Sequence, residues 1–303
     1  MKKIGTGRTA EVYDYKDSKV LKLFYSAFSD KTIEDEYLIA KNISATTSLV
    51  PKVYDIVHIR NRTGIVYEKI KGKMLSDYLS GNIINSRKII RKFAQTQEKI
   101  SNINIENVPN YTDKLRQSIA SSNLLSDSEK ETVLKYLNII NNNEICHGDY
   151  HPENVFVDQN HDFKVIDWAN MFVSNKYLDI ARTYYLIKSG KSLNGKTKLG
   201  SLIEWFGRQV IAKFYWEEVK AGTGIKEYFL PCLFIVILTR YDENIEQEKK
   251  WIYNYVMKNK ERMIKAMDVR EGVNSISYLA ICFPFWKYKK SAVTSCVFSS
   301  NFT

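Results

Sequence analysis

The stretch Ile145-Cys-His-Gly-Asp-Tyr-His-Pro-Glu-Asn154, with Phe163-Lys-Val-Ile-Asp-Trp168 after it, decides the fold of this chain. Asp149 and Asn154 share a polar loop, and a short hydrophobic segment then leads to Asp167. We expect that segment to be a buried strand that returns Asp167 to the side of the loop. Phosphoryl transfer needs a base for the attacking hydroxyl and oxygen ligands for the Mg²⁺ that bridges the ATP phosphates. The spacing predicts Asp149 as the base and Asn154 with Asp167 as the metal ligands.

A plainer interpretation is a polar loop in which Asp149 and Asn154 only form turns, as short polar side chains often do. Several further motifs, which follow in the expected order along the chain, favour the phosphoryl-transfer site over that alternative.

The pattern His147-x-Asp149-x-x-x-x-Asn154 with Ile166-Asp-Trp168 resembles the catalytic and metal-binding motifs of the aminoglycoside phosphotransferase and choline kinase superfamily. Members are small-molecule relatives of protein kinases, which would carry H-R-D and D-F-G at these places. The resemblance implies an α+β, bilobal protein-kinase-like fold with a small antiparallel-sheet N-lobe and a larger helical C-lobe. We expect residues 1–71 to form the nucleotide-binding lobe and residues 72–303 the helical catalytic and substrate lobe.

The N-terminal segment Gly5-Thr-Gly7-Arg-Thr-Ala-Glu-Val12 fits the pattern G-x-G-x-x-G-x-V, with an alanine at the third glycine position. Gly5 and Gly7 would let backbone amides approach the ATP phosphates, although a glycine-containing hairpin turn would give the same letters. Two alternating segments, 11–15 and 19–24, follow with a turn between them. We therefore predict a hairpin over the nucleotide.

Val20-Leu-Lys22 matches the strand position whose lysine pairs with the ATP phosphates and with a glutamate of the next helix. We assign Lys22 to that position and expect Lys19, at the turn, to be solvated. On the helix expected from residue 30 to residue 43, Glu36 shares one face with the apolar positions, because side chains repeat every three to four residues. Glu36 is therefore the predicted partner of Lys22.

Two further strands are predicted over 51–59 and 64–70, with a turn over 61–64, and they complete a five-stranded antiparallel sheet with one helix. Glu68-Lys-Ile70 then resembles the hinge between lobes of the family, where main-chain groups would bind the adenine edge. We predict Glu68 and Ile70 as nucleotide-binding positions. An ordinary edge strand that leads into a loop is the alternative.

After the hinge the apolar period changes from two to about 3.6 residues, which predicts a mostly helical remainder. The expected helices cover 86–100, 127–140, 201–216 and 228–239, and Asp127 is the N-cap candidate of the second. The last of them is an apolar run of 12 residues. Because a membrane span needs about 20 apolar residues, we expect a buried core helix instead.

Residues beside the main motifs have supporting roles in the prediction. The resemblance implies that Asp179 supports the catalytic loop from beneath. We expect Trp168 and Arg182 to be structural and His147 to orient the loop by hydrogen bonding. His151 stays open between a turn residue and a site residue.

Composition bounds the remaining possibilities. With 303 residues, 44% of them hydrophobic, the chain can bury two modest cores or one core divided by a cleft. The chain has four cysteines, Cys146, Cys232, Cys282 and Cys296, and none of them shows C-x-x-C spacing. This pattern predicts reduced thiols, no zinc site and a cytoplasmic protein. The first strand is expected to begin directly after the N-terminus, which leaves no room for a signal peptide.

The net charge of +11, from 45 basic and 34 acidic residues, could indicate a nucleic-acid or membrane partner. The lysines are dispersed along amphipathic helices such as 86–99 and 246–265, so solvated helix faces explain them. We expect a small-molecule hydroxyl substrate as partner, no nucleic acid and no integral membrane segment, and we leave the oligomeric state open. The aromatic and basic tail, 278–303, suits a peripheral membrane contact, a partner groove, a packed segment or a disordered end.

The sequence thus predicts an ATP- and Mg²⁺-dependent phosphotransferase that acts on a hydroxyl group of a small molecule. A basic chain weakens an aminoglycoside as acceptor, since a polycation prefers an acidic pocket. Local acidity could still come from one of six residues: Glu204, Glu217, Glu218, Asp242, Glu243 and Glu246. The alternatives are a choline- or sugar-type metabolite kinase and a nucleotide-binding pseudokinase or regulatory protein. A protein kinase is disfavoured because no D-F-G to A-P-E activation segment is present.

Overall fold

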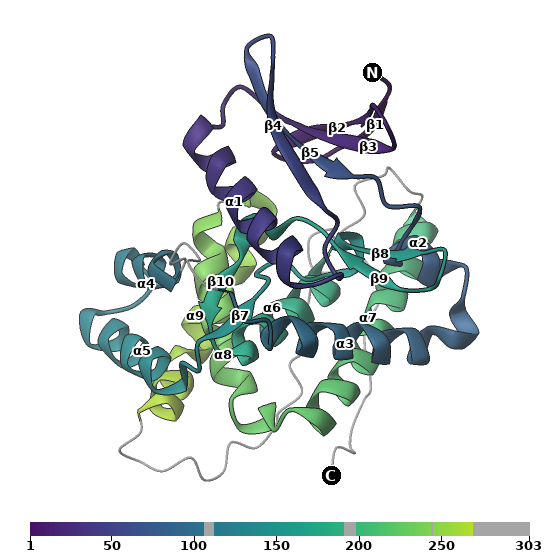
Figure 1. Ribbon diagram of the computed structural model, residues 1–303. Coiled ribbons are helices and arrows are strands. Elements are labelled where there is room, and N and C mark those ends of the chain that lie inside the picture. The colour runs from purple at the N-terminus through teal and green to yellow at the C-terminus, as the bar shows by residue number, and fades with distance from the viewer. Residues whose placement is uncertain (106–111, 191–197, 244, 269–303) are drawn as a thin grey trace.

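The computed structural model describes residues 1–105, 112–190, 198–243 and 245–268. Figure 1 shows a small sheet with one helix beside it, above a larger body made mainly of helices. The expected α+β arrangement is therefore present. The lobe boundary between residues 71 and 72 stays a prediction, and the tail after residue 268 lies outside the described residues, with Cys282 and Cys296.

The N-terminal sheet has the strand order β1-β2-β3-β5-β4, and every neighbouring pair is antiparallel. Its strands are β1 (Lys3–Thr6), β2 (Ala10–Tyr15), β3 (Lys19–Phe24), β4 (Val53–Ile59) and β5 (Arg62–Glu68). The predicted five-stranded sheet is confirmed. Its order places β3, and with it Lys22, at the centre of the sheet.

The turn between β4 and β5 differs from the prediction. It consists of Arg60 and Asn61, and Arg60 has a positive φ of 53°. Gly64, which we had placed in the turn, lies within β5, where an added Cβ would come within 2.8 Å of the Leu21 side chain and 2.9 Å of the Lys22 carbonyl oxygen. The glycine is thus required by the close approach of β3, and not by turn geometry.

Helix α1 (Asp30–Thr46) packs beside this sheet (Figure 1). It begins where the Ser29 side chain accepts a hydrogen bond from the amide of Thr32. Its buried residues recur at the spacing of one helical face: Ile33, Glu36, Ile39, Ala40 and Ile43. Glu36 is therefore the one acidic residue of the helix that points inward.

The larger part contains two small sheets, one of β6 (Gly72–Met74), β8 (Val155–Asp158) and β9 (Phe163–Val165), the other of β7 (Glu144–Cys146) and β10 (Phe172–Ser174). Strand β9 buries Phe163 and Val165, as expected of the segment before Asp167. The antiparallel pairing of β8 with β9 brings the residues before the first strand beside those after the second. This pairing positions the site.

Eight helices make up most of the rest of the described chain: α2 (Leu75–Ser80), α3 (Ser86–Ser101), α4 (Thr112–Ser121), α5 (Asp127–Ile140), α6 (Lys176–Ser189), α7 (Lys198–Gly222), α8 (Phe229–Arg240) and α9 (Glu246–Met267). Helix α5 is capped by Ser126 and not by Asp127 as predicted, because Ser126 and Glu129 form a reciprocal capping box. Helix α8 is buried along almost its whole length, which confirms a core helix. Among the described residues, no helix combines the length and apolar character needed to cross a membrane.

Candidate active site

Lys22 lies where the sheet meets the helical part. Its Nζ atom is 2.7 Å from Glu36 Oε1 and 2.9 Å from Asp167 Oδ1. Burial by itself lowers the pKa of Lys22, but the two carboxylates outweigh it and hold that pKa above its usual value. The structure thus brings together three of the residues predicted for the site. Lys19, which we expected to be solvated, instead lies over the Tyr54 ring, 4.4 Å from its centroid.

Asp167 has a left-handed backbone, with φ 63° and ψ 65°. This conformation is uncommon outside glycine and is held here by its neighbours. The amide of Ile166 donates to the Asn154 carbonyl oxygen (2.9 Å), and a ring nitrogen of His147 lies 3.0 Å from the Ile166 carbonyl oxygen. Trp168 is buried and donates its indole N–H to Val165, as a packing residue would. The strained turn directs the Asp167 carboxylate toward Lys22.

The loop between β7 and β8 holds Asp149. The side-chain amide of Asn154 donates to the Asp149 carbonyl oxygen (2.9 Å) and to its carboxylate (3.1 Å), while the Asp149 amide donates to His147 Nδ1 (3.2 Å). Burial alone would raise the pKa of Asp149, but hydrogen bonding to His151 and the charge of Arg182 hold it well below its usual range. Asp149 is therefore a carboxylate at neutral pH.

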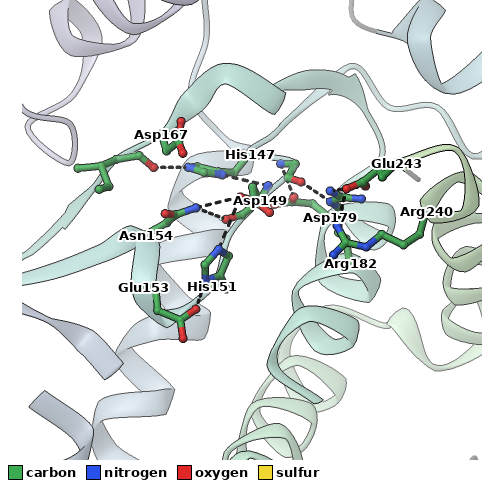
Figure 2. A network of polar contacts seen from close by, with 12 residues as sticks. His147, Asp149, His151, Glu153, Asn154, Asp167, Asp179, Arg182, Arg240 and Glu243 are labelled. Atoms are coloured by element: carbon green, nitrogen blue, oxygen red, sulfur yellow. Dashed lines mark hydrogen bonds and ion pairs between the residues drawn. The ribbon is translucent and has the colours of Figure 1, made fainter. Parts of the chain in front are cut away.

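The peptide group of Gly148 is held from both sides. Its amide donates to Asp179 Oδ1 (2.8 Å), and its carbonyl oxygen accepts from Nε of Arg182. Gly148 has a φ of 77°, and an added Cβ would collide with the backbone of Asn170, so glycine is required here. Figure 2 shows both supports beside Asp149. The contact of Asp179 with the loop agrees with the supporting role that the resemblance implies.

Gln97 and Glu243, neither of them predicted for this role, complete the support of the loop. Gln97 of α3 donates to Asp179 Oδ2 (2.8 Å), and Glu243 accepts from Arg182 (2.8 Å). Glu243 also pairs with Arg240 of α8, so the loop is tied to the helical core (Figure 2). The contacts of Gln97 with Asp179 and of Glu243 with Arg182 join segments far apart in the sequence, so no local pattern predicts them.

His151, left open by the sequence, is a member of the site. Its Nε2 lies 3.6 Å from Asp149 Oδ2 and its Nδ1 2.7 Å from Glu153 Oε2, so the ring bridges two carboxylates (Figure 2). Burial lowers its pKa, but these carboxylates outweigh burial and raise it to about 9. Glu153 had no predicted role, although its place inside the motif offered a signal.

The remaining predicted positions lie in the N-terminal sheet or directly after it. The Gly7 amide donates to Ala10 (2.8 Å), which closes the turn between β1 and β2, and Gly5 pairs with Val12 across that hairpin. At the hinge, the amide of Lys69 donates to the Ser18 carbonyl oxygen (3.1 Å).

This hydrogen bond bears on the predicted hinge contacts. Because it occupies the Lys69 amide, the amide of Ile70 is the better candidate for an adenine contact. Glu68 is tied to Lys52 through its own amide (2.8 Å) and its carboxylate (3.1 Å).

Oxygen atoms of Asn154 and Asp167 could hold a magnesium ion. The two hydrogen bonds of Asn154 both use its Nδ2 atom, so its Oδ1 is left for another contact, and the Asp167 side chain is 38% exposed. No cluster of three or more His, Cys, Asp or Glu side chains suited to a metal occurs in the described parts of the chain. Mg²⁺ is commonly held by one or two carboxylates together with substrate phosphates, so the residues present fit it.

Comparisons with known proteins identify the family of the chain. The family model described as the phosphotransferase enzyme family (APH) matches residues 1–210. The chain belongs to this family. None of the curated proteins matches the sequence.

Solved structures of similar fold include the ternary complex of streptomycin, ATP and APH(2″)-IIa, with 14% identity, a TM-score of 0.50 and coverage of 83% of this chain and 88% of that one. The choline kinase LicA from Streptococcus pneumoniae is 12% identical, with a TM-score of 0.48, over 86% of this chain and 92% of that one. At such identities the likeness shows the fold alone. The likeness to the APH(2″)-IIa complex confirms the protein-kinase-like fold expected from the sequence, and family membership supports a small-molecule phosphotransferase.

Proposed function

We propose that this member of the phosphotransferase family transfers the γ-phosphate of ATP to a hydroxyl group of a small molecule. The observation that carries the proposal is the double ion pair of Lys22 with Glu36 and Asp167. A lysine fixed by a helical glutamate, beside a metal-binding aspartate, is the arrangement that holds nucleotide phosphates in kinases.

Asp149 orients the acceptor hydroxyl. Because its pKa is depressed, the carboxylate is ionised and accepts a hydrogen bond from the hydroxyl rather than removing its proton in advance. The proton passes to the Asp149 carboxylate as the new oxygen–phosphorus bond forms and the bond between the γ-phosphorus and the leaving oxygen of ADP breaks. Asn154 holds the carboxylate from the other side, so its orientation is set before the acceptor binds.

The nucleotide would lie between the sheet and the loop. Gly5 and Gly7 carry no side chains, so the turn between β1 and β2 would let the main chain approach its phosphates, and the Ile70 amide would face the adenine edge. Asn154 and Asp167 would hold Mg²⁺, which, when bound, neutralises charge on the phosphate oxygens. Lys22 must then give up part of its contact with Asp167 in favour of the phosphates.

The acceptor we propose carries little positive charge, as a sugar- or choline-type metabolite does. All six acidic residues considered for an aminoglycoside pocket already have partners: Glu204 with Arg208, Glu217 with Arg87, Glu218 with Arg91, Asp242 with Ser118, Glu243 with Arg182 and Arg240, and Glu246 with Lys249. A polycation would have to compete with these bonds. This favours a metabolite kinase over an antibiotic-modifying enzyme.

The test is to incubate the protein with Mg²⁺, labelled ATP and a panel of acceptors: glucose, uridine, choline, ethanolamine and kanamycin. We expect transfer to a neutral or singly charged acceptor to exceed transfer to kanamycin. ATP binding with no transfer to any acceptor or to water would contradict the proposed enzymatic activity and would indicate a nucleotide-binding pseudokinase. Preferred transfer to kanamycin would contradict only the acceptor class.

A further inference from the structure

A chain of ion pairs runs from Asp149 to helix α7. His151 bridges Asp149 and Glu153, and the second oxygen of Glu153 lies 3.0 Å from Nη2 of Arg208. Arg208 also pairs with Glu204 one turn earlier on the same helix (3.4 Å). A residue 59 positions beyond Asp149 is therefore connected to it by three successive contacts.

The charges along this chain alternate in sign. The Glu153 carboxylate lies between the His151 ring, 2.7 Å from Nδ1, and the guanidinium group of Arg208, 3.0 Å from Nη2. The side chains of His151 and Arg208 are only 19% and 16% exposed, whereas that of Glu153 is 43% exposed. Each member thus contacts a neighbour of opposite charge, and a displacement of one member can be transmitted to the next.

Arg208 lies against Gly190 and has one donor atom without a partner in the described residues. An added Cβ on Gly190, at the end of α6, would collide with Nη1 of Arg208, so glycine at this position leaves room for the guanidinium group. The Nε atom of Arg208 is buried and has no hydrogen-bond partner within the described residues. An arginine that served stability alone would be expected to satisfy this donor.

We propose that Arg208 is a positioning residue for the transfer reaction, which acts through Glu153 and His151 to fix the Asp149 carboxylate against the acceptor hydroxyl. The inference rests on the proposed function, in which Asp149 orients that hydroxyl. Because Arg208 projects from α7, the packing of this helix sets the position of the reacting carboxylate. A displacement of about 1 Å at a reacting group can cost about 10²-fold in rate.

The experiment compares Arg208→Met and Arg208→Lys with the control Arg91→Met, which removes an ion pair between α3 and α7 without touching the chain to Asp149. Turnover and KM are measured with the best acceptor of the panel above, and the dissociation constant of Mg-ATP by calorimetry. Gly190→Ala serves as a second variant, because it displaces the guanidinium group and keeps its charge. Circular dichroism checks that each variant is folded.

We expect Arg208→Met to lower kcat by about 10-fold to 10²-fold, with the Mg-ATP dissociation constant unchanged. Arg208→Lys should recover part of the loss, Gly190→Ala should share it, and Arg91→Met should keep the wild-type rate. In an Asp149→Asn background, Arg208→Met should cost nothing more, because residues that act through one another are not additive. A structural role would instead lower the rate equally in both backgrounds.

The experiment distinguishes failure of the positioning role of Arg208 from failure of the proposed function. If the wild type transfers phosphate and folded Arg208→Met does so at the same rate, the positioning role is overturned while the proposed function stands. If the wild type transfers phosphate to no acceptor and not to water, the proposed function itself fails, and the positioning role fails with it.

Discussion

Lys22 and Asp167 are 145 positions apart in the sequence, yet their side chains form an ion pair of 2.9 Å. The pair joins the central strand of the N-terminal sheet to the turn after β9 and so closes the candidate site between the two parts of the fold. Glu36 takes the other side of the same ammonium group. Nucleotide binding must therefore begin from a site whose charges are already paired.

Replacing Lys22 tests this arrangement. Lys22→Ala removes the buried cation between Glu36 and Asp167, so we expect Mg-ATP affinity to fall at least about 10-fold, since a charge-assisted contact to a phosphate is worth about 1.5–3 kcal/mol. Lys19→Ala is the matched control from the same strand, because the Lys19 ammonium group lies over the Tyr54 ring and not beside Glu36 or Asp167. Calorimetry of Mg-ATP binding checks both variants, and equal losses would show that the strand register does not determine phosphate binding.

Asp167 is predicted to provide the charged metal ligand. Asp167→Ala should abolish the magnesium dependence of nucleotide binding and turnover, because a bridging cation loses a carboxylate. Binding of ATP should be compared with and without Mg²⁺ in the wild type and the variant. Full magnesium-dependent activity in the variant would contradict the assignment of Asp167 as a magnesium ligand.

Stability should depend on the glycine within β5. Gly64→Ala inserts a Cβ where the Leu21 side chain and the Lys22 carbonyl leave no room, so we expect a loss of about 1–3 kcal/mol in the free energy of unfolding. Gly222→Ala is the control, because a Cβ there meets no atom within 4 Å, and alanine favours a helix by about 1 kcal/mol. Urea denaturation measures both, and equal midpoints for the two variants would contradict the close approach of β3.

The sequence predicts those features of the fold and the candidate site that depend on residues close together in the chain. The sequence predicts that Asp149, Asn154 and Asp167 lie close together because their motif is nearly contiguous and ends in a short buried strand, and the structure confirms that proximity. Gln97 and Arg208 were missed because their contacts cross between helices, where neither spacing nor residue type marks a partner. Gly64 was misjudged because a glycine needed for strand packing resembles a turn glycine, and Asp127 because Ser126 beside it makes the better cap.

Because His151 bridges two carboxylates, we expect the folding stability of the protein to depend on pH. The pKa of His151 is raised to about 9, so the stability that its positive charge contributes is full below its ordinary value of 6.5 and is lost as the pH rises through about 9. The pKa of Glu153 is lowered to about 2, so its contribution is full above 4.5 and is lost toward pH 2. Unfolding curves of the wild type and His151→Gln should therefore differ most between pH 4.5 and 6.5.

The variant Glu153→Gln is the control for the difference in stability between the wild type and His151→Gln. In Glu153→Gln the imidazolium loses one of its two carboxylates, so the loss of stability at high pH should begin at a lower pH than in the wild type. A difference between wild type and His151→Gln that persists unchanged at pH 10 would mean that packing, and not charge, accounts for the role of the ring.

The last prediction separates an enzyme from a nucleotide sensor through Asp149. A group that orients and deprotonates the acceptor contributes about 10²–10⁴-fold to the rate. Because it faces the acceptor, it should contribute little to ATP affinity. Asp149→Asn keeps the shape of the side chain and its contact with Asn154 while it removes the charge. Turnover should therefore fall by about 10²–10⁴-fold, whereas the dissociation constant of Mg-ATP should stay within a few fold of the wild-type value.

The matched control is Glu153→Gln, which also removes one carboxylate from the loop but keeps the Asp149 side chain itself. It should lose less activity than Asp149→Asn, because Asp149 keeps both its charge and its bonds to Asn154. If the wild type turns over an acceptor and Asp149→Asn does so equally well, Asp149 is not the group that faces the hydroxyl. Another carboxylate would then have to occupy that position, and Glu153, the nearest along the loop, would be the first to replace.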